Sequence, residues 1–295
     1  MTTVGLLVGS ASTALGRELE VALAVPTVYA ELRTFPDSEF CVRAPLSRAP
    51  ETVVIVQGTP PPQDRNLQEL YQLVDVAISQ RCRNVVCVVP YLAYARQDKR
   101  TVPGEPFSAR IVLQTLAALG ASRLITVEVH NQRIFNDAPI DAASLSVTGL
   151  FADSLSRLNL HDPVLISPDE GGTQRLRAIG EILGWPILAL RKFKNERGHT
   201  WYEGRIPQVK GRSVIVIDDL CSSGSTVIPL ARHLFECGVG DIHYGVVHFF
   251  ANPQAILDKI GQPIEIFATD SIPNPTARIS LAPVVADFIK NQYIS

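Results

Sequence analysis

Residues 214–226 read Val-Ile-Val-Ile-Asp-Asp-Leu-Cys-Ser-Ser-Gly-Ser-Thr, and this stretch decides the fold class of the chain. The apolar run 214–217 is typical of a buried strand in a parallel sheet. Small polar residues follow it, and a helix is expected over 225–237. A strand that leads through a short loop into a helix is the repeating unit of α/β proteins. We therefore expect Asp218 and Asp219 at the carboxyl end of a strand, where open α/β sheets place their ligands.

The loop after these acids has the composition of a phosphate-binding loop. Small residues let backbone N–H groups surround an anion, and the helix N-terminus adds its positive dipole. Asp218 and Asp219 suit the hydroxyl groups of a sugar. The alternative is a serine-rich helix cap beside two solvated acids, but the strand and the acid pair favour phosphate. The candidate phosphate ligands are Ser222, Ser223, Gly224, Ser225 and Thr226.

Composition excludes several classes of protein. The 295 residues are 46 % hydrophobic and 19 % charged, which is enough apolar material for two cores and too little charge for a disordered chain. The 27 Lys and Arg residues nearly balance the 29 Asp and Glu residues, so no overall basic field attracts nucleic acid or a membrane surface. The five cysteines are scattered, which is typical of a reducing cytosol. Every apolar run is far shorter than the roughly 18 residues of a membrane helix, and we expect a cytoplasmic protein.

Short β-branched runs alternate with helical stretches along the whole chain, which predicts parallel sheets with helices on both faces. We expect two α/β domains, 1–145 and 146–295, with a boundary near 141–147 and the last dozen residues packing back on the first. No sequence repeat is visible, although the two halves could share an architecture. The expected strands are 4–8, 53–57, 85–89, 124–129, 164–167, 187–190, 213–217, 242–249 and 264–269. The expected helices are 13–23, 67–79, 108–119, 173–183 and 225–237.

Residues 214–226 resemble the phosphoribosyl pyrophosphate (PRPP) loop of phosphoribosyltransferases and ribose-phosphate pyrophosphokinases. The resemblance implies a phosphoribosyltransferase-like fold in which the two acids hold the ribose 2- and 3-hydroxyls and the loop holds the 5-phosphate. Residues 90–100, Pro-Tyr-Leu-Ala-Tyr-Ala-Arg-Gln-Asp-Lys-Arg, are similar to the ATP-binding segment of the pyrophosphokinases. Their cations form a local basic cluster that suits a polyphosphate. By this resemblance Arg96, Gln97, Asp98 and Lys99 bind ATP.

Two further segments resemble the nucleotide site of the pyrophosphokinases. Residues 35–39, Phe-Pro-Asp-Ser-Glu, are similar to the stretch that holds adenine across a subunit interface. Phe35 offers a stacking face, and Asp37 and Glu39 can accept hydrogen bonds from an amino group. His130 ends a predicted strand and matches the histidine that contacts the Mg²⁺–nucleotide. Without the resemblance, the first would be a surface turn and the second a structural histidine.

Residues 167–172, Ser-Pro-Asp-Glu-Gly-Gly, are similar to the family's Ser-Pro-Asp-x-Gly-Gly motif. Asp169 can bind a ribose hydroxyl or a hard cation such as Mg²⁺, and with His130 it completes the predicted metal contacts.

Residues 191–199 are charged and lack a core-forming pattern, so we expect a mobile loop there. The corresponding loop of the family closes over the nucleotide and supplies a lysine and, two residues later, an arginine. Lys192 matches the lysine, and Lys194 stands where the arginine is usual; both are predicted to be catalytic. Ser222, Ser225 and Glu128 also depart from the usual residues, which marks a divergent member.

The resemblance implies a ribose-phosphate diphosphokinase that transfers the pyrophosphoryl group of ATP to the 1-hydroxyl of ribose 5-phosphate, giving PRPP and AMP with Mg²⁺ as cofactor. It also implies a homo-oligomer, a dimer or a hexamer. Two alternatives stay open. One is a catalytically weak regulatory subunit of the same family, which the departures at Ser222 and Lys194 would favour. The other is a phosphoribosyltransferase that consumes PRPP, which leaves Phe35, Arg96 and His130 without a role.

Overall fold

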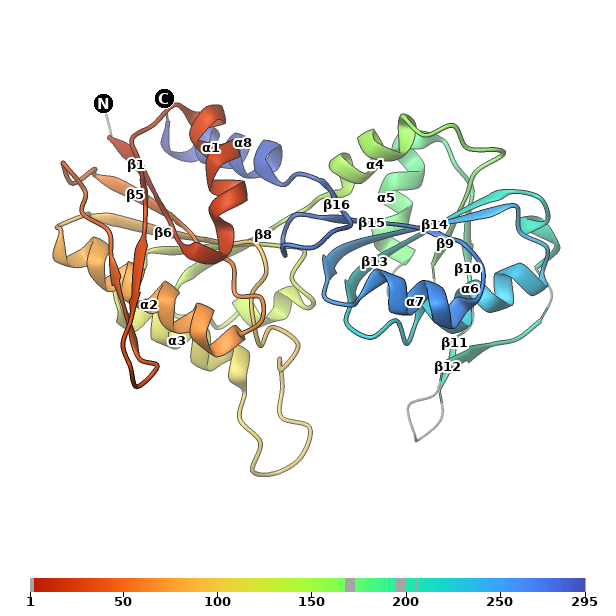
Figure 1. Cartoon of the computed structure of the whole chain (residues 1–295), viewed down its shortest axis with the longest axis horizontal. Helices are drawn as coiled ribbons and strands as arrows, with labels where there is room; N and C mark the ends of the chain where they lie inside the picture. The colour runs from red at the N-terminus through yellow and green to blue at the C-terminus, as the bar shows by residue number, and fades with distance from the viewer. Residues whose placement is uncertain (1–2, 168–172, 191, 195–199, 205, 295) are drawn as a thin grey trace. The chain divides into compact units, whose positions relative to one another are not determined.

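The computed structural model describes residues 3–167, 173–190, 192–194, 200–204 and 206–294, with the backbone alone at 174, 192 and 194. The chain forms two compact units. Unit 1 comprises Met1–Ser146 and Leu281–Ser295, and unit 2 comprises Val147–Ser280. Each unit is built on its own six-stranded sheet with helices on both faces (Figure 1).

The elements of unit 1 are, in chain order, β1 (Val4–Val8), the 3₁₀ turn η1 (Ser10–Ser12), α1 (Thr13–Leu23), β2 (Thr27–Tyr29), β3 (Glu31–Thr34), β4 (Phe40–Arg43), β5 (Thr52–Val56), α2 (Gln63–Ser79), β6 (Asn84–Val89), α3 (Ser108–Ala118), β7 (Arg123–Val127), η2 (Gln132–Phe135), β8 (Asp141–Leu145) and α8 (Ala282–Tyr293). Those of unit 2 are α4 (Thr148–Ser156), β9 (Val164–Ser167), α5 (Thr173–Leu183), β10 (Ile187–Ala189), β11 (Lys192–Lys194), β12 (Thr200–Tyr202), η3 (Pro207–Val209), β13 (Ser213–Cys221), α6 (Val227–Glu236), β14 (Asp241–Phe249), α7 (Pro253–Ile260), β15 (Glu265–Thr269) and β16 (Ala277–Ile279).

The two sheets have the same topology. Sheet A of unit 1 runs β2-β1-β5-β6-β7-β8, and sheet C of unit 2 runs β10-β9-β13-β14-β15-β16, with every pair parallel. In both units an antiparallel hairpin is inserted in the chain between two strands of the main sheet: β3–β4 lies between β2 and β5, and β11–β12 lies between β10 and β13. The strand order reverses between β1 and β5 and between β9 and β13. Open α/β sheets bind ligands at such reversals, outside the carboxyl ends of the strands.

Helices cover both faces of each sheet, as all-parallel sheets require. In unit 1, α1 packs with α8 on one face, and α2 and α3 lie on the other (Figure 1). In unit 2, α4 packs with α5 and α6 packs with α7 on opposite faces. The central strands are buried along their length; all five residues of β5, for example, are buried. Apolar runs without alternation therefore reflect strands that are covered on both sides.

The sequence analysis was wrong about several element boundaries. The strand expected to end at 217 continues to Cys221, because Asp218 pairs with Val246 and Leu220 with His248 on β14. The following helix begins at Val227, not at 225, and α2 begins four residues earlier than expected, at Gln63.

The polar stretch 191–199 was expected to be a loop, but its described residues Lys192–Lys194 form β11, which pairs with β12. Short strands with one exposed face are held by pairing and side-chain stacking, which composition alone does not reveal. For the same reason the sequence analysis missed β2, β3, β4, β8, β12 and β16, and it also expected no helix at α4, α7 or α8.

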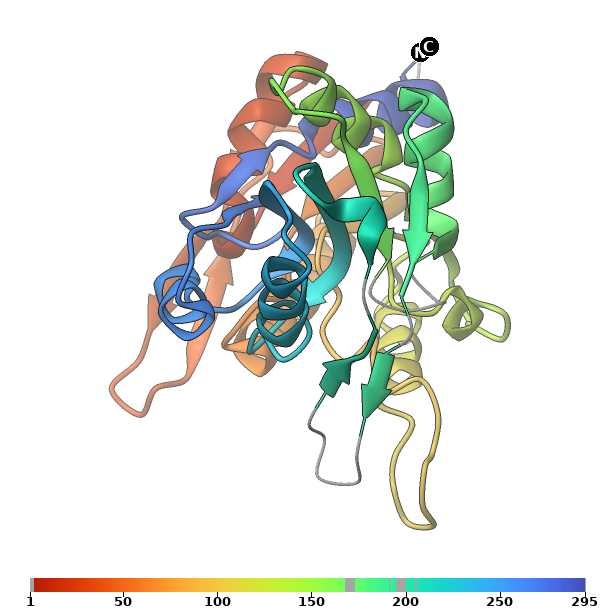
Figure 2. The same ribbon diagram turned by 90° about the vertical axis from the view of Figure 1, so that its right-hand side faces the viewer.

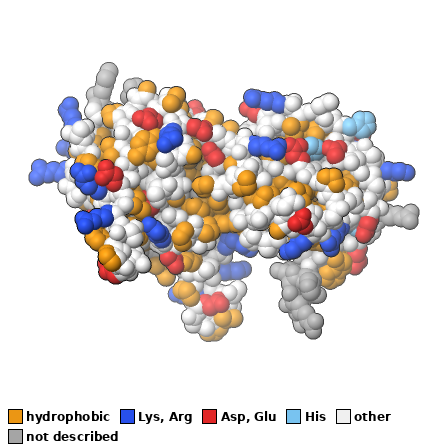
Figure 3. Space-filling view, in the orientation of Figure 1, with side chains coloured by type: hydrophobic (Ala, Val, Ile, Leu, Met, Phe, Trp, Pro, Cys, Tyr) orange, Lys and Arg blue, Asp and Glu red, His pale blue; other side chains and the backbone are white. Residues whose placement is uncertain are grey.

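The surface carries charges of both signs. In Figure 3, Lys and Arg side chains are interspersed with Asp and Glu side chains over both units on the face shown. This distribution agrees with the net charge of −2. Among the helices that the structure describes, none is long and apolar enough to cross a membrane.

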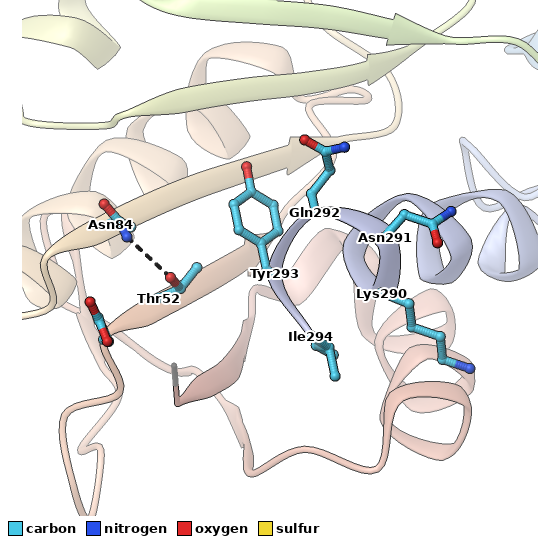
Figure 4. Close-up of a pocket in the computed structure, with 8 residues that line it drawn as sticks. Thr52, Asn84, Lys290, Asn291, Gln292, Tyr293 and Ile294 are labelled. Carbon is cyan, nitrogen blue, oxygen red and sulfur yellow. Dashed lines mark hydrogen bonds between the residues drawn. The ribbon is translucent and has the colours of Figure 1, made fainter. Parts of the chain in front are cut away.

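Unit 1 has a pocket of about 280 Å³ at the edge of sheet A where β5 and β6 begin (Figure 4). Thr52 and Asn84 start these strands, and the amide of Asn84 donates to the Thr52 hydroxyl at 3.3 Å. The C-terminal end of α8 forms the other wall, where Tyr293 points toward the two strands. The pocket therefore lies at the amino ends of the strands, opposite the edge where ligands of such sheets bind.

Gly245 in the middle of β14 provides a test of the packing in unit 2. A Cβ at this position would lie 2.6 Å from Ile217 Cδ1, 2.7 Å from Phe267 Cζ and 2.9 Å from Phe151 Cε1. We expect Gly245→Ala to destabilise unit 2 by about 1–3 kcal/mol, since the close-packed side chains of Ile217, Phe267 and Phe151 must move. Urea denaturation followed by circular dichroism measures this change.

Gly149→Ala is the matched control. Gly149 lies in the first turn of α4, and nothing lies within 4 Å of a Cβ built there. This variant should be neutral or more stable by up to about 1 kcal/mol, because alanine favours helix. Equal destabilisation of both variants would contradict the packing argument.

Candidate active site

The acid pair lies in β13, at the point where the order of sheet C reverses. The backbone N–H of Asp219 donates to Asp218 Oδ1 at 2.9 Å, and the Tyr244 hydroxyl donates to Asp218 Oδ2 at 3.1 Å. Burial raises the pKa of Asp218 to about 7, and the adjacent charge of Asp219 acts in the same direction. Near neutral pH, Asp218 is therefore shared between its two protonation states, and a ligand that donates hydrogen bonds to the carboxylate would favour the ionised form.

The loop 222–226 leads from β13 into α6. Gly224 has a φ of 78°, a backbone conformation that favours glycine, and a Cβ there would also lie 2.9 Å from Ile228 Cδ1. Its carbonyl accepts from the Ile228 N–H at 2.9 Å, in the first turn of the helix. Ser222, Ser223 and Ser225 are exposed. The loop thus combines small accessible residues with the N-terminus of a ten-residue helix, which suits an anion.

Strand β9 lies next to β13, with Ile166 opposite Val216. It ends at Ser167, so the chain leaves β9 at the same edge of sheet C as the acid pair. Asp169, which is predicted to bind ribose or metal, lies outside the described residues.

The hairpin β11–β12 carries the two predicted catalytic lysines. Lys192 is paired with Tyr202 and Lys194 with Thr200. The side chains of both lysines, and residues 195–199, lie outside the description. The aromatic rings of Phe193 and Trp201 stack across the hairpin, with centroids 5.6 Å apart. Figure 2 shows these strands as a separate ribbon below sheet C.

Tyr202 connects this hairpin to α6, the helix that follows the loop 222–226. Its buried ring stacks on His233 of α6 with centroids 6.4 Å apart. The hairpin is therefore packed against the helix that the loop 222–226 opens.

In unit 1, the segment after β6 and the residues after β7 meet at the carboxyl edge of sheet A. The Asn131 amide donates to Asp98 at 2.5 Å. This hydrogen bond holds the pKa of Asp98 below its ordinary value, and electrostatic interactions with Lys99 and His130 act in the same direction. Asp98 thus lies close enough to Lys99 and His130 to interact electrostatically with both, and their role in binding ATP stays a prediction.

Gln97 and Arg96 belong to the same segment. The Ser108 hydroxyl at the start of α3 donates to Gln97 Oε1 at 2.5 Å. Burial raises the pKa of Tyr91, and the nearby Arg96 charge opposes this shift. The segment is therefore tied to the sheet and to α3.

Asn131 was missed by the sequence analysis. Its side chain accepts from the Arg133 N–H at 3.1 Å and caps η2 while its amide donates to Asp98. The strand expected over 124–129 ends at Val127, so His130 and Asn131 lie in the following loop. An asparagine in such a loop can accept from the backbone N–H two residues later, which is an Asx turn.

The predicted adenine residues lie at the tip of the β3–β4 hairpin. Phe35 is 36 % exposed, and the Arg33 guanidinium lies over its ring at 5.1 Å. Asp37 and Glu39 are exposed, and the Glu39 N–H donates to Asp37 at 3.2 Å. The tip lies apart from the loop that follows β6 in both views of unit 1 (Figures 1 and 2). One copy of the chain therefore does not bring Phe35 to the residues 96–99.

Comparison with known proteins agrees with both units. Residues 4–120 match the N-terminal domain of ribose phosphate pyrophosphokinase, and residues 139–279 match the phosphoribosyl transferase domain. A relative named ribose-phosphate pyrophosphokinase from Methanopyrus kandleri is 34 % identical over 97 % of this chain and 98 % of its own. Another of that name, from Maricaulis maris, is 33 % identical over 97 % of this chain and 95 % of its own.

A crystal structure of phosphoribosylpyrophosphate synthetase from Mycobacterium smegmatis superimposes with a TM-score of 0.84 at 24 % identity, covering 98 % of each chain. This likeness confirms the predicted phosphoribosyltransferase-like fold. The Methanopyrus and Maricaulis proteins are more than 30 % identical to this chain over nearly its whole length, which shows the family as well as the fold. The chain belongs to the ribose-phosphate pyrophosphokinase family and is an enzyme of that family, as its motifs predicted.

Proposed function

We propose that the chain transfers the β,γ-pyrophosphoryl group of ATP to the 1-hydroxyl of ribose 5-phosphate, which releases AMP and PRPP. The observation that carries this proposal is the site at the reversal of sheet C. Two carboxylates and a glycine-containing helix start follow one another on β13, so acceptors for sugar hydroxyls stand beside donors for a phosphate. Ribose 5-phosphate carries both groups.

The ribose would bind with its hydroxyls on Asp218 and Asp219 and its 5-phosphate on residues 222–226. Asp218 keeps acceptor capacity on both oxygens after its two hydrogen bonds, because an ionised carboxylate has about four lone-pair sites. The described serines of the loop are exposed and can reach a phosphate.

ATP would bind at the carboxyl edge of sheet A. Arg96 and Lys99 supply positive charge to the triphosphate, and Gln97 and Asp98 are held in place by Ser108 and Asn131. The adenine would stack on Phe35, with Asp37 and Glu39 accepting from its amino group.

Mg²⁺ fits the donors of this site. Among the described residues no three His, Cys, Asp or Glu side chains form a group that could hold a metal by themselves. Mg²⁺ needs no such cage, since it keeps several waters and binds through few carboxylates together with substrate phosphates. His130 and Asp169 are the proposed protein contacts, and the ion would neutralise charge on the transferred group.

Lys192 and Lys194 would stabilise charge on the transferring phosphorus and the departing AMP. Phosphoryl-type transfer asks little covalent chemistry of the protein, so positioning and charge neutralisation dominate. Their strand is paired with β12, which is packed on α6 through Tyr202, so the lysines are attached to the frame that carries the sugar-phosphate loop.

The adenine residues support a homo-oligomer. Phe35 stands at the exposed tip of a hairpin, apart from residues 96–99 of its own chain. A symmetric partner could supply Phe35 to each nucleotide site, as closed homo-oligomers commonly share sites. We propose a dimer or a hexamer on this basis.

AMP release from ATP and Mg²⁺, with and without ribose 5-phosphate, tests the reaction. We expect AMP only when the sugar phosphate is present. Lys192→Ala should lower kcat by about a hundredfold or more, with KM values changed far less, since the lysine acts in the transition state. Lys259→Ala, an exposed lysine of α7, is the matched control and should leave kcat unchanged.

Three outcomes of this assay would contradict the proposal. ADP release without ribose 5-phosphate would indicate another kinase chemistry. Nucleotide binding without turnover would favour the regulatory subunit. A normal kcat in Lys192→Ala would exclude the catalytic role of that lysine.

Co-expression of two inactive variants tests the shared adenine site. Phe35→Ala and Lys192→Ala should each be nearly inactive at low ATP. If Phe35 and Lys192 of one site come from different copies, mixed dimers hold one intact site. Random pairing would then restore about a quarter of the wild-type rate. A mixture no more active than its separate components would place both residues of a site in one chain.

The raised pKa of Asp218 predicts a conflict between stability and function. The native state holds a proton that the unfolded state releases between about pH 4 and pH 7, so stability falls as pH rises through this window. The Asp218→Asn variant lacks the charge, so its free energy of unfolding should equal that of the wild type at pH 4. At pH 8 its free energy of unfolding should be higher than that of the wild type by on the order of 1–2 kcal/mol.

Thermal unfolding at several pH values measures this difference. Asp258→Asn, an exposed carboxylate of α7, is the control and should show no such pH-dependent gain. A loss of stability in Asp218→Asn at pH 8 would contradict the assignment.

A further inference from the structure

Tyr244 is a fully buried tyrosine that the proposed reaction does not use. It lies on β14, 1 % exposed, opposite Val216 of β13 and Ile266 of β15. Its ring belongs to the apolar core of unit 2, where a phenylalanine would pack equally well. The hydroxyl is therefore the part that requires an explanation, because a buried phenol needs a hydrogen-bond partner.

The Tyr244 hydroxyl has two partners on β13. It donates to Asp218 Oδ2 at 3.1 Å, and it lies within hydrogen-bonding reach of the Cys221 thiol. Cys221 is buried, and the backbone N–H of Gly224 reaches the same thiol. One buried phenol thus connects the acid that faces the sugar with the turn of the phosphate loop.

We propose that Tyr244 is a positioning residue that holds Asp218 in the orientation that receives the ribose hydroxyls and ties this acid, through Cys221, to the phosphate loop. The inference rests on the proposed binding of ribose 5-phosphate at this site. With the Asp219 N–H on Oδ1 and the Tyr244 hydroxyl on Oδ2, each carboxylate oxygen has one fixed donor. Rotation of Asp218 about its side chain would break one or both hydrogen bonds.

The same contact affects the ionisation of Asp218. Among the residues whose side chains the structure describes, four groups face this carboxyl: Asp219 and Cys221 on its own strand, Tyr244 on β14 and Arg175 on α5. Burial and Asp219 raise the pKa of Asp218, whereas the Tyr244 hydrogen bond and the Arg175 charge lower it. Loss of the phenol hydroxyl should therefore raise this pKa further, since a donor to the ionised form is removed.

Tyr244→Phe tests the proposal with the ring kept in the core. We expect KM for ribose 5-phosphate to rise about three- to tenfold, while kcat and KM for ATP stay within about twofold. We also expect the acidic limb of kcat/KM for ribose 5-phosphate to move to higher pH by about half a unit to one unit. A merely structural hydroxyl would change the unfolding temperature without moving this limb.

Tyr29→Phe is the matched control, because it removes another tyrosine-to-carboxylate hydrogen bond from unit 1. The Tyr29 hydroxyl donates to Glu20 Oε2 at 2.7 Å, between β2 and α1. This variant should leave both KM values and the pH profile unchanged.

The Cys221→Ala variant distinguishes the contribution of the thiol from that of the hydrogen bond between Tyr244 and Asp218. It removes the thiol and leaves the hydrogen bond from Tyr244 to Asp218, so the acidic limb should stay in place. If Cys221→Ala reproduced the shift of Tyr244→Phe, the effect would belong to the thiol and the proposed hold on Asp218 would be wrong.

The remaining outcomes distinguish this inference from the proposed function. If the wild type is active and Tyr244→Phe has the same KM for ribose 5-phosphate and the same pH profile, the positioning role of Tyr244 is wrong and the proposed reaction stands. If the wild type releases no AMP, calorimetric binding of ribose 5-phosphate at pH 6, 7 and 8 replaces the assay. Weaker binding by Tyr244→Phe, greatest at pH 6, would then support the inference although the reaction had failed. A wild type that binds no ribose 5-phosphate overturns both.

Discussion

The parallel pairing of β13 with β14 beyond Ile217 is the constraint on which the candidate site depends. Asp218 is held opposite Val246, so the acid pair belongs to a rigid, hydrogen-bonded strand and not to a loop. This pairing also sets Tyr244 beside Asp218 and starts the phosphate loop at a fixed point. It exposes the acids to a partly apolar environment, which raises the pKa of Asp218 to about 7. The pairing of β13 with β14 therefore both fixes the position of the acid pair and raises the free energy of ionising the half-buried Asp218.

The two units share a topology, yet among the described residues the features that we propose for an anion site, a glycine-containing loop that opens a helix, stand at the sheet reversal of unit 2 and not at that of unit 1. In unit 1 the loop after the third strand of the sheet contains Pro60, Pro61 and Pro62, which have no backbone N–H to offer a phosphate. The start of η1 is already occupied, since the buried Glu69 accepts from both the backbone and the hydroxyl of Ser10. The nucleotide candidates of unit 1 accordingly lie one and two strands away, after β6 and β7.

The sequence predicted the framework of the fold because fully buried parallel strands are continuous apolar runs, as in β5 and β13. It failed where strands are short and half exposed: β11 reads as a charged loop and is a strand only through its pairing with β12 and the stacking of Phe193 on Trp201. Motifs assigned Asp98 and His130 to one nucleotide site, and the two residues interact electrostatically in the structure, while their binding of ATP stays a prediction. They did not reveal Tyr244, which reads as an ordinary core residue because its partner Asp218 is 26 positions away in the chain.

A polar group that belongs to no motif can still be identified by asking what its burial requires. The Tyr244 hydroxyl adds nothing to the core, and its burial would destabilise the protein without a partner. Its partner is an acid whose own ionisation is disfavoured by burial and by the charge of Asp219. The hydrogen bond between the two groups thus reduces the desolvation penalty of both. Hydroxyl donors of a ligand would stabilise the ionised carboxylate further. On this argument the cost of ionising Asp218 and the proposed recognition of a polyol phosphate both follow from the environment of this one carboxyl group.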